Sequence, residues 1–86
     1  MRPAEEIKTA ETELFEKLWY DRHKMLANKR RIDPQILVEA EKMALQIEIK
    51  YRGKLGPYND LHWGMLLGKL SALRWVLGYE WDFLDT

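Results

Sequence analysis

The sequence predicts an all-α fold, a three-helix up-down-up bundle that spans residues 1–86 as a single helical domain. Three observations lead to this prediction. Three segments are rich in good helix formers, their apolar residues recur at helical spacing, and proline and glycine fall at their ends. The predicted helices cover about 4–28, 34–52 and 60–77, and a short, packed, acidic and aromatic C-terminal tail follows them.

The first predicted helix begins just after Pro3, because proline suits the first turn of a helix. Its early turns carry several glutamates, which the positive end of the helix dipole favours. One face is apolar, through Ile7, Leu14, Leu18 and Met25, with Phe15, Trp19 and Leu26 beside them. This helix is the longest of the three, so we expect its polar first two turns to overhang the other helices.

The second predicted helix starts at Asp33 and Pro34, an N-cap carboxylate followed by a proline at the first helical position. Gly53 is placed to end it. Its predicted core stripe is Ile36, Ala40, Met43 and Ile47, with Leu37, Ala44 and Tyr51 beside it. Further apolar residues on its other sides are Val38, Leu45 and Ile49. A helix that is apolar nearly all round needs neighbours on more than one side.

The third predicted helix follows a turn, because Gly56 and Pro57 cannot continue a helix and Asn59 or Asp60 can cap the next one. Gly78 can end it in a left-handed conformation. Its apolar residues have heptad-like spacing and form a predicted core face: Trp63, Leu66, Leu67, Leu70, Leu73 and Leu77.

Small residues recur at every fourth position of the third helix, at Gly64, Gly68 and Ala72. Such a stripe leaves a groove where another backbone can approach closely, and an interior glycine costs a helix about 1 kcal/mol relative to alanine unless a contact compensates. Two occupants explain the groove. We favour slightly another helix of the same chain over a helix from a second copy or a partner protein. The stripe is the candidate helix-packing or interface site.

The connection between the first two helices is basic, since residues 22–31 hold five lysines and arginines and no acid. Lys29, Arg30 and Arg31 form a candidate phosphate-binding patch, which makes a small nucleic-acid-associated regulator the alternative function. In an up-down-up bundle, the acidic tail reaches the same end of the molecule. We therefore favour internal neutralisation of the patch over nucleic-acid binding.

Catalytic and metal-binding patterns are missing from the sequence. It contains no Gly-rich phosphate loop, nucleophile elbow or HExxH motif. His23 and His62 lack the Glu-x-x-His spacing by which di-iron bundles place imidazole and carboxylate on one face. We predict no catalytic residue, no metal and no cofactor.

Two charged residues, Lys69 and Arg74, are embedded in the apolar third helix. The best enzyme constellation would pair one of them with an acid such as Asp21 or Asp82, but buried ion pairs of this kind more often fix packing than catalyse. An enzyme or small-ligand binder, with a pocket between helices near these charges and the ring of Trp63 or Trp75, is the third hypothesis.

Composition limits the classes of function. The formal net charge is zero, from 14 basic and 14 acidic residues, so no global field steers the chain toward nucleic acid or an anionic membrane. The absence of cysteine fits a reducing compartment. No apolar block follows the acidic N-terminus, and charges interrupt the most apolar stretch, so we expect neither a signal peptide nor a membrane span. The predicted location is cytoplasmic.

Apolar residues are abundant for so short a chain. They make up 47% of it and include four tryptophans, more large apolar surface than a small core buries. The leading hypothesis is a small, non-catalytic helical protein-protein interaction module that self-associates. We expect a homo-oligomer, with a dimer as the first expectation.

Overall fold

A computed structural model describes residues 1–26 and 33–81 of the chain. These residues form three helices and no strand: α1 (Ala4–Leu26), α2 (Pro34–Lys50) and α3 (Asp60–Val76). The all-α prediction is confirmed. Helices α2 and α3 end two residues and one residue earlier than predicted, and the last two residues predicted for the first helix lie outside the described residues. Among the helices described, none combines the length and apolar character needed to span a bilayer.

Local signals in the sequence set the helix ends. The Asp33 carboxylate accepts a hydrogen bond from the Gln35 backbone N–H at 2.8 Å, and Asn59 caps α3 in the same way. Gly53 and Gly78, at φ 70° and 102°, follow α2 and α3 in the left-handed region that favours glycine. The predicted start and stop signals are therefore confirmed.

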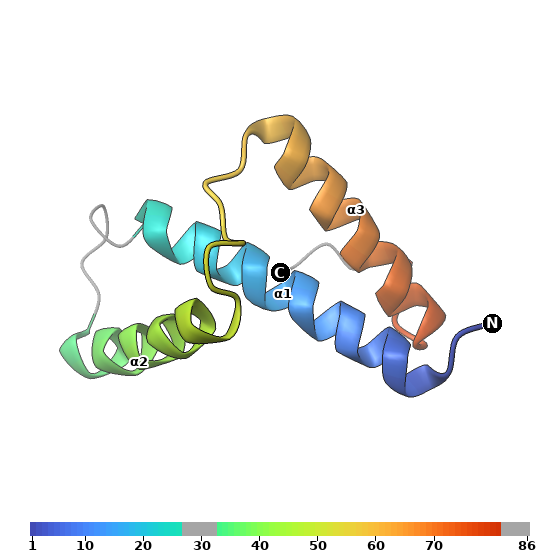
Figure 1. Cartoon of the computed structure of the whole chain (residues 1–86), viewed down its shortest axis with the longest axis horizontal. Coiled ribbons are helices and arrows are strands. Elements are labelled where there is room, and N and C mark those ends of the chain that lie inside the picture. The colour runs from blue at the N-terminus through green and yellow to red at the C-terminus, as the bar shows by residue number, and fades with distance from the viewer. Residues whose placement is uncertain (27–32, 82–86) are drawn as a thin grey trace.

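Helix α1 is the central element, and α2 and α3 pack on it without contacting each other in the described part of the chain (Figure 1). Helix α3 is antiparallel to α1. Arg74 near the end of α3 lies 3.7 Å from Glu11, and Trp63 near its start lies below Arg22, with 5.9 Å between the guanidinium carbon and the ring centroid.

Helix α2 is also antiparallel to α1. Its end meets the middle of α1, where Lys50 Nζ lies 2.8 Å from Glu16, and Glu41 lies 3.0 Å from His23 nearer the end of α1. Both flanking helices thus run opposite to α1, which corrects the up-down-up order of directions. The reason is the path of the connection between α2 and α3. Gly56 in this connection lies close against Asp21 of α1, because a Cβ added to Gly56 would be 2.6 Å from Asp21 Oδ1. The connection therefore runs back along α1, and α3 begins beside the last turns of α1.

The core lies between α1 and α3. Leu18, Leu66 and Leu70 are buried, and five half-buried side chains pack against them: Leu14, Phe15, Tyr58, Trp63 and Leu67. Full burial of one leucine contributes roughly 1.5–3 kcal/mol, so this cluster is the main source of stability. Met25, predicted to lie on the same apolar face of α1, is instead 61% exposed.

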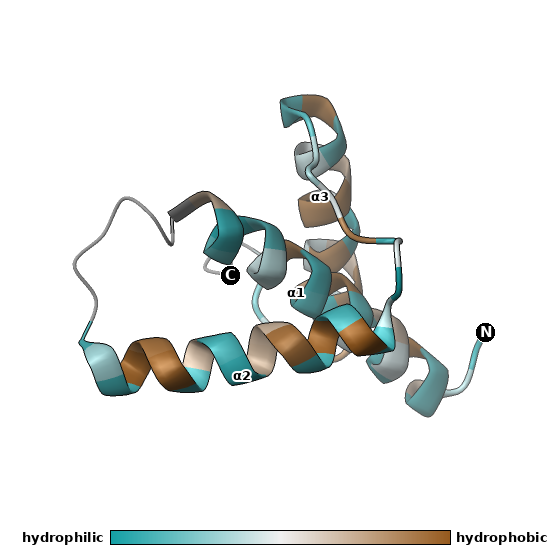
Figure 2. Ribbon diagram, turned by 60° about the vertical axis from the view of Figure 1, so that its left-hand side comes forward, coloured by the Kyte–Doolittle hydropathy of each residue, from teal (hydrophilic) through white to brown (hydrophobic). Residues whose placement is uncertain are grey.

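Helix α2 buries only Ala44 and Ile47 among its described residues. Ile36, predicted to lie in its core stripe, is 63% exposed because the start of α2 extends beyond its contact with α1. Val38, Leu45 and Ile49 are also exposed, and apolar segments recur along this helix at one side of the molecule (Figure 2). The neighbours expected on more than one side of α2 are not present among the described residues.

The first turns of α1 do not overhang. Because α3 is antiparallel to α1, its last turns lie beside them, and residues of both helices, including Glu5, Thr9, Lys69 and Leu73, line an open groove of about 870 Å³. Of the predicted tail, residues 82–86 lie outside the described residues. Its first part is exposed: the ring of Trp81 meets the ring of Trp75 edge to face, with centroids 5.5 Å apart.

Candidate functional site

One face of α3 points away from α1 and is apolar along the whole helix. Leu61, Met65, Gly68, Ala72 and Val76 follow it at intervals of three or four residues, and all five are exposed. We call these residues, together with Gly64 and Trp75 beside them, the outer face of α3. Large apolar residues lie at both ends of this face, and small residues lie between them.

The small-residue stripe has no occupant among the described residues. A Cβ added at Gly64 or Gly68 would meet no described atom within 4 Å, apart from neighbours in its own helix. The intrachain contact favoured from the sequence is therefore absent from the described part of the chain. Two interior glycines therefore cost helix stability and gain no packing from the residues that the structure describes.

Charges lie along one edge of the outer face, at the groove between α3 and α1. Lys69 is exposed at its edge and lines the groove between α3 and α1. Across this groove lie three glutamates of α1: Glu5, Glu6 and Glu13. Ala72 belongs both to the stripe and to the wall of the groove, so a helix laid on α3 would meet apolar residues first and charges of both signs at its margin.

Arg74 is buried, as expected, but its acidic partner is Glu11 rather than Asp21. Arg74 Nε lies 3.7 Å from Glu11 Oε2, and both side chains are at most one-tenth exposed. Lys8 donates a hydrogen bond of 2.7 Å to the other Glu11 oxygen, and this bond raises the pKa of Lys8. The Arg74 guanidinium also lies over Phe15, 5.5 Å from the ring centre. This arrangement fixes the packing of α3 on α1.

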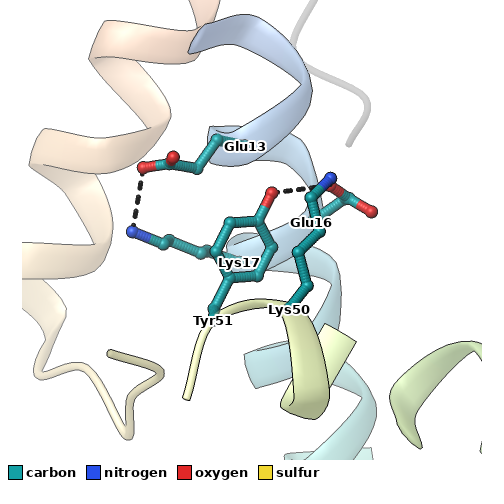
Figure 3. Close-up of polar contacts among 5 residues, drawn as sticks. All are labelled: Glu13, Glu16, Lys17, Lys50 and Tyr51. Atoms are coloured by element: carbon teal, nitrogen blue, oxygen red, sulfur yellow. Dashed lines mark hydrogen bonds and ion pairs between the residues drawn. The ribbon is translucent and has the colours of Figure 1, made fainter. Parts of the chain in front are cut away.

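A second polar cluster joins α1 to the end of α2 (Figure 3). Lys50 and the Tyr51 hydroxyl donate to the same Glu16 oxygen, at 2.8 and 2.7 Å. Burial raises the pKa of Glu16, but the bonds from Lys50 and Tyr51 outweigh burial and lower it below its ordinary value. Burial and the bond to Glu16 raise the pKa of Tyr51. Lys17 donates a hydrogen bond to Glu13, and its Nζ lies over the Tyr51 ring, 5.3 Å from the ring centroid.

The two histidines lie apart. The ring of His23 stacks on Trp19, with centroids 5.0 Å apart, and its Nε2 lies 3.0 Å from Glu41. His62 meets the edge of Tyr58 at 4.7 Å between ring centres. Among residues 1–26 and 33–81, no three potential ligand side chains come close enough together to hold a metal ion.

The candidate phosphate-binding patch, Lys29, Arg30 and Arg31, lies outside the described residues and stays a prediction. Its expected neutralisation by the acidic tail stays a prediction as well. Tyr79, at the start of the tail, lies against Arg74, beside the first half of α1. This is a consequence of the direction of α3.

Reasoning from sequence missed the buried Glu11, and it named the buried Asp21 only as a possible partner of Lys69 or Arg74. Their signal is spacing. Both fall within the apolar face of α1, at the positions that separate Ile7 from Leu14 and Leu18 from Met25. Acids at core-facing positions indicate buried partners or a pocket.

Comparison of the chain with protein-family models, with characterised proteins and with solved structures gives no match.

Proposed function

We propose that this protein is a small, non-catalytic helical interaction module that self-associates through the outer face of α3, with a dimer as its simplest form. The observation that carries the proposal is the exposure of this face. Leu61, Met65, Trp75 and Val76 are each at least half exposed on it. Contiguous apolar patches of this kind mark association surfaces in proteins.

The open stripe supports a helix as the occupant. Glycine between larger apolar residues lets two helix backbones come close. Dispersion contacts between the two backbones then compensate for the side-chain contacts that glycine lacks. In an isologous dimer, the same face of each copy meets its counterpart across a two-fold axis.

The proposal assigns no reaction and no cofactor. It places the protein in the cytoplasm, a reducing compartment in which proteins rarely contain disulfides. The absence of cysteine is consistent with this location. Nucleic-acid binding through residues 29–31 remains the alternative. It predicts binding that weakens steeply as the salt concentration rises.

Light scattering over a wide range of concentration tests self-association. The mass is expected to rise from that of one 10.3 kDa chain toward twice that value. Met65→Lys places a charge at the centre of the interface and is expected to weaken association by about tenfold or more, which corresponds to about 1.4 kcal/mol.

Leu45→Lys is the matched control, because Leu45 on α2 and Met65 on α3 are similarly exposed, at 59% and 54%. It should leave association unchanged. A constant monomer mass at every concentration would refute self-association. Loss of association in the Leu45 variant alone would place the interface on α2 and refute the assignment to α3.

A further inference from the structure

A small pocket lies where the end of α1, the connection before α3 and the first turn of α3 meet. Its volume is about 250 Å³, and its walls are Asp21, Arg22, Met25, Tyr58, Asp60 and Trp63. None of these residues belongs to the outer face of α3. The pocket therefore presents a second surface, independent of the proposed dimer interface.

A buried acid forms one wall of this pocket. Asp21 is only 5% exposed, so its carboxylate has little contact with water except through the pocket that it lines. Gly56 makes this burial feasible, because a Cβ there would lie 2.6 Å from Asp21 Oδ1 and 2.8 Å from the Tyr58 backbone nitrogen. A carboxylate taken out of water costs free energy unless a cation or hydrogen-bond donors compensate.

Two aromatic residues, Tyr58 and Trp63, also line the pocket. Burial raises the pKa of Tyr58; Lys17 opposes this rise and the negative charge of Asp21 adds to it, so the charge of Asp21 acts on the tyrosine. The face of Trp63 already receives a cation, since the Arg22 guanidinium carbon lies 5.9 Å from its centroid. Aromatic faces attract organic cations, most strongly where water is excluded.

We propose that this pocket binds a small organic ammonium ion, with its charge between Asp21 and Asp60 and its carbon substituents against Tyr58 and Trp63. The two carboxylates outnumber the one guanidinium on the pocket wall, which favours a cation over an anion, and a buried acid disfavours a neutral apolar ligand. Arg22 acts as the internal cation that occupies the face of Trp63 when no ligand is bound. The inference goes beyond self-association and does not depend on it.

Titration of the full chain with choline tests the proposal, with 3,3-dimethyl-1-butanol as the neutral molecule of the same shape. Chemical shifts of the tryptophan indole N–H groups report binding, and a Trp63→Phe variant identifies the signal of Trp63. Choline is expected to shift this signal saturably, and the neutral alcohol is expected to bind at least about tenfold more weakly. Equal binding of the two molecules would overturn the proposal.

Charge variants give a second test. Asp21→Asn keeps the shape of the side chain and is expected to weaken choline binding by about tenfold or more. Asp60→Asn tests the exposed acid without disturbing the buried one and is expected to weaken binding less. Arg22→Gln removes the internal cation and should strengthen binding. Glu39→Gln, an equal charge change on the exposed side of α2, is the control.

A further titration distinguishes two sources of the ammonium group, a free small molecule and a modified lysine side chain. A short peptide that carries trimethyllysine is titrated beside free choline, and tighter binding of the peptide assigns the pocket to a modified protein side chain. Choline binding that survives in both acid variants would overturn the proposal, as would the absence of saturable binding by either probe.

Discussion

Helices α2 and α3 are the same length and both run antiparallel to α1, but different forces hold them there. Helix α3 buries Leu66 and Leu70 against Leu18, and the pair Arg74–Glu11 closes the far end of this contact. Helix α2 buries only Ala44 and Ile47, and polar contacts at its margins provide the rest of its attachment to α1. The structure therefore combines one apolar helix pair with one lightly attached helix.

The largest expected effect is on the apolar pair. Leu70→Ala removes a side chain that is fully buried and is expected to lower the free energy of unfolding by about 2–5 kcal/mol. Urea unfolding measures this change. Leu45→Ala on α2 is the control, because an exposed leucine should change stability by no more than about 0.5 kcal/mol. Equal losses in the two variants would contradict the assigned core.

A local effect is expected on α2. Ile47→Ala should lower stability by about 2 kcal/mol or more and release α2 from α1 while the α1–α3 pair persists. Hydrogen exchange measures this selectively, because amides of α2 should lose protection and those of α3 should keep it. Equal loss of protection in both helices would mean that the fold unfolds as one unit, and the comparison would be wrong.

A smaller effect comes from pH. The folded-state pKa of Glu16 lies below its ordinary value of 4.5, so its contribution is present above that value and is lost as pH falls through the lowered pKa. We expect α2 docking to weaken by about 1 kcal/mol on this acidification, since the Lys50 partner is exposed.

The measurement is the urea midpoint as a function of pH, in the wild type and in Glu16→Gln. The variant lacks the titrating group, so the difference in stability between the two proteins should shrink below pH 4.5. A difference that stays constant, or grows, in acid would contradict this role of Glu16.

Local features of this fold were predictable from sequence, and non-local ones were not. Asp33, Asn59 and the glycines after α2 and α3 set helix ends through neighbours in the chain, so the boundaries followed. The direction of α3 depends on where α2 stops along α1 and on the fit of Gly56 against Asp21, which no periodicity encodes. The contact between Arg74 and Glu11, which lie on different helices, is equally non-local and was not predicted.

In the candidate site, too, local features were predictable and non-local ones were not. The spacing of Gly64, Gly68 and Ala72 identified the stripe, but spacing cannot say whether a helix of the same chain fills it. A pocket near the Trp63 or Trp75 ring was a hypothesis from the sequence, but its expected neighbours were Lys69 and Arg74. The pocket beside Trp63 instead joins Asp21 to residues almost forty positions later, which spacing does not reveal. Buried acids on the apolar face of α1 were the available signal.

The central claim is that the outer face of α3 is open in the single chain and covered in the assembly. Gly68→Ala tests it most directly, by urea unfolding at increasing protein concentration. At dilution, alanine should stabilise the variant by about 1 kcal/mol, because its Cβ meets no described atom. At high concentration, the wild type should gain stability through association and the variant should gain less. A variant less stable than the wild type at dilution, or an equal gain in both, would contradict the claim.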